Sequence, residues 1–87
     1  LMRISVELTF TPLQNEFEET ILKFIKKLRS SQFTVLENPL STQVYGEYSE
    51  VMEFLTSEMK EAFELIEIGI IWMKIVKSDR SNYVSTK

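Results

Sequence analysis

Hydrophobic and polar residues alternate along the first stretch of the chain. Apolar side chains recur there at every second position, at Ile4, Val6, Leu8 and Phe10. A period of two is typical of a β-strand with one buried face and one open face. The pattern therefore predicts a strand over residues 3–10, which Thr11-Pro12 ends.

Two longer stretches have helical periodicity instead. In residues 15–30, Asn15 stands three positions before Glu18, which is the spacing of a capping box, and the apolar stripe comprises Phe17, Ile21, Phe24, Ile25 and Leu28. In residues 48–64, Glu47 or Ser49 can cap the helix, and the stripe comprises Val51, Phe54, Leu55, Met59, Ala62 and Phe63. Each stripe predicts a helix that packs one face on a sheet.

Three further strands complete the pattern. Residues 33–37 and 41–46 flank Asn38-Pro39 closely enough to predict an antiparallel hairpin, in which Gly46 serves the geometry of the following turn. Residues 66–77 are apolar on both faces, which favours a strand with little solvent contact.

The resulting order is β-α-β-β-α-β. It predicts a ferredoxin-like α+β fold, a four-stranded antiparallel sheet with two helices on one face and the first and third strands in the centre. We expect a single domain over residues 1–80 and a polar C-terminal tail over residues 81–87.

Composition narrows the possible functions. The chain has no cysteine and no histidine, which removes the commonest nucleophiles, general bases and metal ligands. We therefore expect no catalysis, no metal and no cofactor. Its net charge of -3 argues against a nucleic-acid surface. No apolar run is long enough to span a bilayer, so we expect a cytoplasmic protein without membrane contact.

Candidate functional residues gather on the sheet face turned away from the helices, here called the open face. If Ile4, Val6 and Leu8 face the helices, the open face carries Glu7, Gln43, Tyr45 and Trp72, unless a bulge at Gly69 exchanges the two faces of the last strand. A patch that is both apolar and aromatic predicts a covering ligand or subunit.

Each candidate on that face has two interpretations. Glu7 either balances a cationic ligand or forms a salt bridge with Lys74 or Arg3. Tyr45 and Trp72 either stack on a flat ring or cation, or pack at a subunit interface.

The hairpin adds Ser41, Thr42 and Gln43. Their hydroxyl and amide groups suit the nitrogens of a heteroaromatic ring, or they are ordinary polar residues of an edge strand.

The sequence resembles the thiamine-binding YkoF-like family over residues 2–80. The resemblance rests on Val6-Glu7-Leu8 with Thr11-Pro12-Leu13, on residues 38–46, on residues 47–52, and on Met73-Lys74-Ile75 followed by Asp79-Arg80. It implies a ferredoxin-like subunit in a homodimer or homotetramer, joined by sheet-to-sheet and edge contacts. It also implies binding of thiamine or its hydroxymethylpyrimidine part, without catalysis. By position, Thr42 carries over first, then Ser41 and Gly46, while Ser41 and Tyr45 depart from the common pattern.

The alternative to a binding protein is a structural or regulatory homo-oligomer whose open face serves only subunit contacts. An acylphosphatase-like enzyme and an RNA-recognition module share the topology. However, residues 11–15 lack the glycines and the arginine of an anion-binding loop, and the third strand lacks a basic and aromatic pattern.

Overall fold

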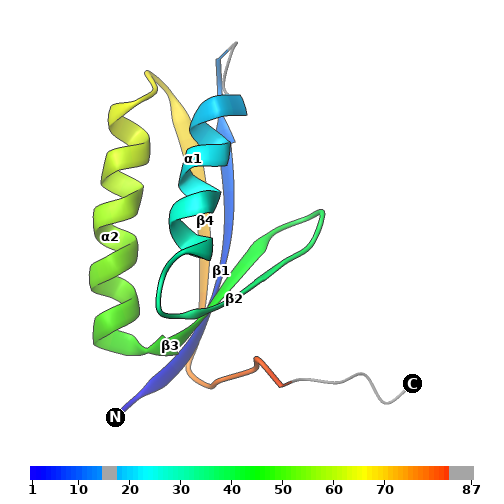
Figure 1. The fold of residues 1–87 in the computed structure, drawn as a ribbon, viewed down its shortest axis with the longest axis vertical. Coiled ribbons are helices and arrows are strands. Elements are labelled where there is room, and N and C mark those ends of the chain that lie inside the picture. Colours follow the sequence, from blue (N-terminus) through cyan, green and yellow to red (C-terminus); the bar gives the residue numbers. More distant parts are fainter. Residues whose placement is uncertain (15–17, 83–87) are drawn as a thin grey trace.

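The computed structural model describes residues 1–14 and 18–82. The elements follow in the order β1 (Arg3–Pro12), α1 (Glu18–Arg29), β2 (Thr34–Glu37), β3 (Thr42–Glu47), α2 (Tyr48–Glu64) and β4 (Gly69–Val76). The sheet has the strand order β2-β3-β1-β4, and all neighbouring strands are antiparallel. Both helices cover the same face of this sheet (Figure 1). The predicted ferredoxin-like α+β fold, with the first and third strands in the centre, is confirmed.

The two faces of β1 are divided as the alternation predicts. Ile4, Val6 and Leu8 face the helices and are almost completely buried in the core. Glu7 lies opposite Gln43 on β3 and opposite Lys74 on β4, so these side chains share the open face. On β4, Trp72 is on the same face, while Ile71 and Met73 pack against the core. The faces of β4 are therefore not exchanged at Gly69.

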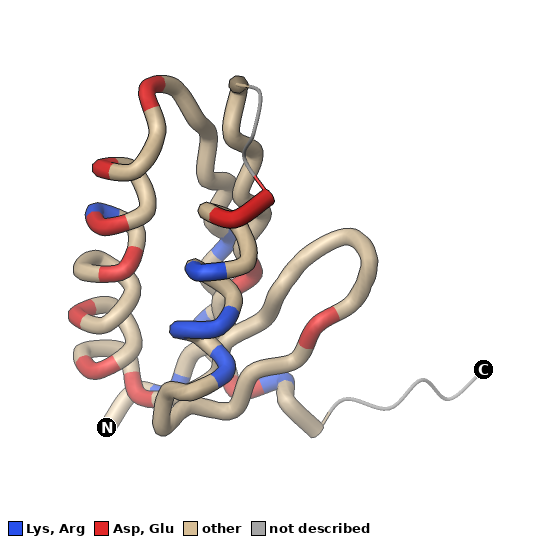
Figure 2. The backbone as a smooth tube through the Cα atoms, turned by 45° about the horizontal axis from the view of Figure 1, so that its top comes forward, with Lys and Arg blue, Asp and Glu red and all other residues tan. Residues whose placement is uncertain are grey.

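Local signals in the sequence explain how the helices begin. Glu47 caps α2, because its carboxylate accepts a hydrogen bond from the Glu50 N–H at 3.1 Å. In α1, acidic residues occupy the first turn and basic residues the last turn, which complements the helix dipole. The predicted cap Asn15 lies outside the described residues. Figure 2 shows Lys and Arg residues in the lower half of α1 and acidic residues at several points along α2.

The first strand is longer than predicted. It continues through Thr11 and Pro12, where Pro12 is the Cα partner of Gly69, and the Leu13 N–H donates to the Ile68 carbonyl at 2.9 Å. Proline lacks an N–H and is tolerated in a strand where one edge is unpaired. That condition holds here, because the pairing of β1 with β3 has already ended at Leu8.

Gly46 is a packing residue of β3 and not the turn residue that the sequence predicted. It pairs with Ile4 in the register, and a Cβ atom on it would lie 2.8 Å from both Phe33 Cδ1 and Val51 Cγ2. The close approach of these two side chains leaves no room for a larger residue.

The last strand is more exposed than its composition predicted. It is an edge strand, and Trp72 retains 68% of its accessible surface, Ile75 44% and Ile70 39%. Ile75, the partner of Val6, lies on the helix side, whereas Trp72 and Ile70 lie on the open face and have no cover within the described part of the chain.

Candidate ligand-binding site

A pocket lies where the ladder between β1 and β3 stops. The register of this pair ends at Leu8 and Thr42, whereas β1 and β4 remain paired as far as Pro12 and Gly69. The loop between β2 and β3 projects away from the upper half of β1 (Figure 1). A pocket of about 230 Å³ lies where this gap between β1 and the loop begins, lined on β1 by residues 8–10.

The wall of this pocket on the helix side is apolar and aromatic. Phe10 from β1 and Phe24 from α1 meet edge to face, with ring centroids 5.4 Å apart, and both line the pocket. Ile21 and Ile25 of α1 extend the same wall, and Leu8 forms its base. Such a surface suits a flat, largely apolar ring.

Thr42 supplies a polar group on that side. It pairs with Leu8 in the register, so its side chain faces the helices, and it is only 7% exposed. Among residues 1–14 and 18–82, its hydroxyl has no hydrogen-bond partner, yet no fully buried polar atom there is unsatisfied. The hydroxyl is therefore accessible from the pocket, where a ligand can bond to it.

The loop that closes the pocket is held by an Asx turn. Asn38 Oδ1 accepts hydrogen bonds from the N–H groups of Leu40 at 2.8 Å and Ser41 at 3.0 Å. The Asn38 N–H in turn donates to the Ser41 carbonyl at 3.1 Å. Thr9 donates from its hydroxyl to the Leu40 carbonyl at 3.4 Å, which ties the loop to β1. The position of Ser41 at the rim is thereby fixed.

Ser41 also joins the pocket to the open face. Its hydroxyl lies 3.0 Å from Glu7 Oε2, to which it donates, and it accepts a hydrogen bond of 2.7 Å from Gln43 Nε2. Lys74 lies opposite Glu7 in the register but beyond ion-pair distance, and Arg3 is paired with Asp79. In the described part of the chain, the predicted salt bridge of Glu7 is thus not formed.

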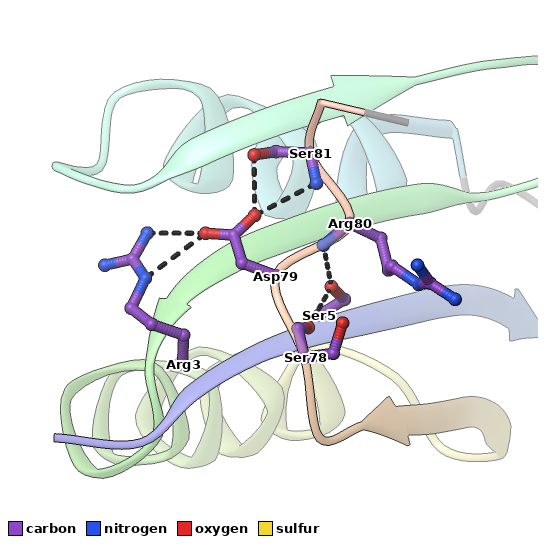
Figure 3. A network of polar contacts seen from close by, with 6 residues as sticks. All are labelled: Arg3, Ser5, Ser78, Asp79, Arg80 and Ser81. Atoms are coloured by element: carbon purple, nitrogen blue, oxygen red, sulfur yellow. Dashed lines mark hydrogen bonds and ion pairs between the residues drawn. The ribbon is translucent and has the colours of Figure 1, made fainter. Parts of the chain in front are cut away.

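The other end of the open face is covered by residues 78–81, here called the C-terminal strap. The strap leaves the end of β4 and crosses β1 toward β3 (Figure 3). Ser5 anchors it, because the Ser5 hydroxyl donates to the Ser78 carbonyl at 2.6 Å and accepts from the Arg80 N–H at 2.8 Å. Ser5 is only 8% exposed as a result.

Asp79 is the second anchor of the strap. Hydrogen bonds from the hydroxyl and the N–H of Ser81, followed by that from Arg3, lower the pKa of Asp79 from 3.8 to about 2. The Arg3 guanidinium approaches Asp79 Oδ2 to 2.8 Å, while Ser81 holds Oδ1 (Figure 3). These bonds favour the ionised carboxylate.

The aromatic residues expected on the open face have different environments. Tyr45 lies opposite Ser5, near the strap, and is 8% exposed. Burial, followed by the charges of Asp79 and Glu7, raises the pKa of its hydroxyl. Trp72 lies opposite Thr9, which places it about 13 Å farther along β1. The two rings therefore do not form one stacking platform.

The structure brings four of the six predicted site residues together and leaves the other two apart. Thr42 and Ser41 line the pocket, and Ser41 joins Glu7 and Gln43 in one hydrogen-bonded chain. Tyr45 and Trp72 stand at opposite ends of the open face. Sequence reasoning placed Phe10 and Phe24 in the core and missed their role as pocket walls, because the point at which the β1–β3 ladder ends has no signal in the sequence.

Comparisons with known proteins agree on the fold. No family model and no curated protein matches the chain. A solved structure from Streptococcus pneumoniae has 24% identity and a TM-score of 0.82, covering 90% of this chain and 89% of that chain. A protein from Thermotoga maritima, provisionally described as a thiamine biosynthesis/salvage protein, has 20% identity and a TM-score of 0.75, covering 84% and 81%. A hypothetical protein from Methanocaldococcus has 16% identity and a TM-score of 0.73, covering 99% and 89%.

The chain has the fold of these small ferredoxin-like proteins. Residues 1–14 and 18–82 contain neither a candidate metal site nor a candidate membrane-spanning helix. No cluster of acidic side chains there could hold a metal ion. None of the helices in that part of the chain is long and apolar enough to cross a membrane.

The strap predicts a specific dependence of stability on pH. Because the pKa of Asp79 is lower in the folded protein, its ionised form stabilises the fold above pH 3.8, and this contribution is lost as the pH falls toward about 2. Urea unfolding should therefore find Asp79→Asn less stable than the wild type at neutral pH, with the difference shrinking across that window. Ser81→Ala should show part of the same effect. A difference that stays constant down to the lowest pH would contradict this assignment.

Proposed function

We propose that this protein binds thiamine or its hydroxymethylpyrimidine part without catalysing a reaction, and that it works as a homo-oligomer. The observation that carries the proposal is the pocket at the end of the β1–β3 ladder. It combines an aromatic wall at Phe10 and Phe24 with an accessible hydroxyl at Thr42. That is the combination that a substituted pyrimidine needs.

The size of the pocket favours one ring over two. At about 230 Å³ it is smaller than the roughly 300–1,000 Å³ typical of sites for drug-sized ligands. A pyrimidine presents ring nitrogens and an amino group at its edge and two apolar faces. The faces suit the phenylalanine walls, and the edge suits the Thr42 hydroxyl, which both donates and accepts. The pyrimidine part of thiamine is therefore the part that we place in the pocket.

Two likenesses support this ligand class. The sequence resembles the YkoF-like family in the hairpin that carries Ser41 and Thr42. The Thermotoga maritima protein of similar fold is provisionally described as a thiamine biosynthesis/salvage protein. Each likeness concerns another protein, and the ligand of this chain is our proposal.

The absence of catalysis rests on the residue types that the chain contains. Without histidine or cysteine, a general base or nucleophile would have to be a carboxylate, lysine, tyrosine or hydroxyl in an activating environment. The polar groups of the pocket itself are hydroxyl and amide groups from Thr9, Asn38, Ser41 and Thr42. These groups suit recognition of a ring rather than proton transfer to it.

Removal of the Thr42 hydroxyl should weaken binding of the pyrimidine. Thr42→Val keeps the shape of the side chain and removes one hydrogen bond, so calorimetric titration with 4-amino-5-hydroxymethyl-2-methylpyrimidine should show a Kd raised by about tenfold. Thr34→Val, at an exposed position on β2, is the matched control and should leave the Kd unchanged. Equal affinities of the two variants, or no heat from the wild type at millimolar ligand, would contradict the proposed function.

A structural homo-oligomer is the second candidate function, and the exposure of β4 favours it. Trp72 and Ile70 are exposed on the open face, and Leu36 is exposed on the same face at β2. Large apolar side chains exposed at both edges of one sheet face favour a protein–protein interface. We propose that a second copy of the chain covers this face, whether or not a ligand is also bound.

Assembly through the open face is tested by one substitution. Trp72→Glu places a charge on the proposed interface, so sedimentation velocity should show a shift from oligomer to monomer. Lys77→Glu, an exposed position beyond the end of β4, is the control for the added negative charge and should retain the oligomer. A wild type that sediments as a monomer would refute the assembly. An assembly that persists in Trp72→Glu would refute the role of the open face.

A further inference from the structure

We propose that Glu7 makes the site selective for ligands that carry a positive charge on a group attached to the ring in the pocket. The inference rests on the proposed function, and it specifies which ligand the site prefers. We expect it to bind thiamine, which is a cation with two rings, more tightly than the neutral hydroxymethylpyrimidine. The basis for this preference is that the pocket wall reaches the open face, where the Glu7 carboxylate stands beside it with no ion-pair partner among residues 1–14 and 18–82.

The pocket is bounded by residues from both faces of the sheet. Phe10 and Phe24 belong to the helix side, whereas Thr9 shares the open face with Trp72, its partner on β4. Ser41 is part of the wall, and its hydroxyl is 3.0 Å from Glu7 Oε2. Glu7 is thus joined to the pocket wall by a single hydrogen bond. A part of the ligand that extends from the pocket onto the open face passes close to its carboxylate.

The charge of Glu7 is available to a ligand. Three cations lie near the open face. Arg3 is neutralised by Asp79, Lys74 faces Glu7 beyond ion-pair distance, and Arg80 of the strap forms no ion pair with Glu7 (Figure 3). The carboxylate accepts one hydrogen bond, from Ser41, whose hydroxyl in turn accepts a hydrogen bond from Gln43. These neutral groups orient the carboxylate and leave its charge uncompensated.

Trp72 provides a second feature that favours a cation. It lies opposite Thr9, which lines the pocket, and 68% of its surface is exposed in the single subunit. A cation over an indole face is attracted by the ring quadrupole. Glu7 and Trp72 therefore flank Thr9 on the open face, one two residues earlier on β1 and the other across the strand pair.

The limited volume of the pocket sends the second ring of a ligand toward these two residues. A pyrimidine that fills the pocket against the edge-to-face pair of Phe10 and Phe24 leaves no room there for the thiazolium ring of thiamine. The thiazolium then lies on the open face beside Glu7, where its permanent positive charge meets the carboxylate. A neutral hydroxymethyl group in its place gains nothing from that charge.

The test measures the affinity of two ligands for two variants, one of which removes a negative charge from the open face and the other a positive charge. Thiamine and 4-amino-5-hydroxymethyl-2-methylpyrimidine are titrated at mildly alkaline pH, where the pyrimidine is neutral, and the ratio of their Kd values measures selectivity for the cation. Glu7→Gln keeps the acceptor for Ser41 and removes the charge, so the preference for thiamine should fall by about five- to tenfold. Lys74→Gln removes the opposing charge and should increase the same preference by about twofold.

The outcomes separate this inference from the proposed function. If the wild type binds neither compound, the proposed function fails and the inference fails with it. If the wild type binds both and Glu7→Gln leaves the ratio of Kd values unchanged, the inference is wrong while the proposed function stands. Matched thermal unfolding midpoints for the variants ensure that a loss of affinity is not a loss of fold, and added salt should reduce the wild-type preference for thiamine.

Discussion

The unequal pairing of β1 with its two neighbours determines the site. Toward β4 the strand is paired as far as Pro12, but toward β3 the ladder ends at Leu8 and Thr42. The backbone of residues 9–12 is thus held straight from one side while the hairpin of β2 and β3 projects from the other (Figure 1). If the β1–β3 ladder continued, β3 would fill the gap, and the phenylalanine wall and the Thr42 hydroxyl would be closed off.

A second consequence concerns communication between the two faces of the sheet. In a fully paired sheet the helix side and the open side are separated by a continuous layer of backbone. Here the rim residue Ser41 contributes to the pocket and bonds with Glu7 on the opposite side. A ligand in the pocket is therefore close to the surface that we propose a second subunit covers. Binding and assembly share a boundary at Ser41 and Thr9.

The sequence predicted the elements well because their signals are local. The alternation from Ile4 to Leu8 correctly predicted the two faces of β1. The predicted faces of β4 also hold, because Ile71 and Met73 pack against the core and Trp72 lies on the open face. The roles that depend on tertiary structure were not predicted correctly. Pro12 is a strand residue only because its second edge is unpaired, and Gly46 is required by the approach of Phe33 and Val51.

The sequence indicated only those parts of the candidate site that have local signals. Polar residues of the hairpin were identified from their chemistry, and Glu7 from its place in a central strand. The pocket itself depends on where a ladder ends, and the strap depends on Ser5 and Asp79, which are 74 positions apart in the chain. Tyr45 was consequently expected to be available to a ligand, whereas the structure buries it on the strap side of the open face.

The central claim is that the pocket beside residues 8–10 of β1 receives the pyrimidine ring. It is tested most directly by intermolecular nuclear Overhauser effects between isotopically labelled protein and unlabelled 4-amino-5-hydroxymethyl-2-methylpyrimidine. We predict contacts from the ligand's methyl group to the Phe24 ring and the Thr42 methyl group. Contacts confined to Trp72 and the open face, or to the outer surfaces of the helices, would contradict the account.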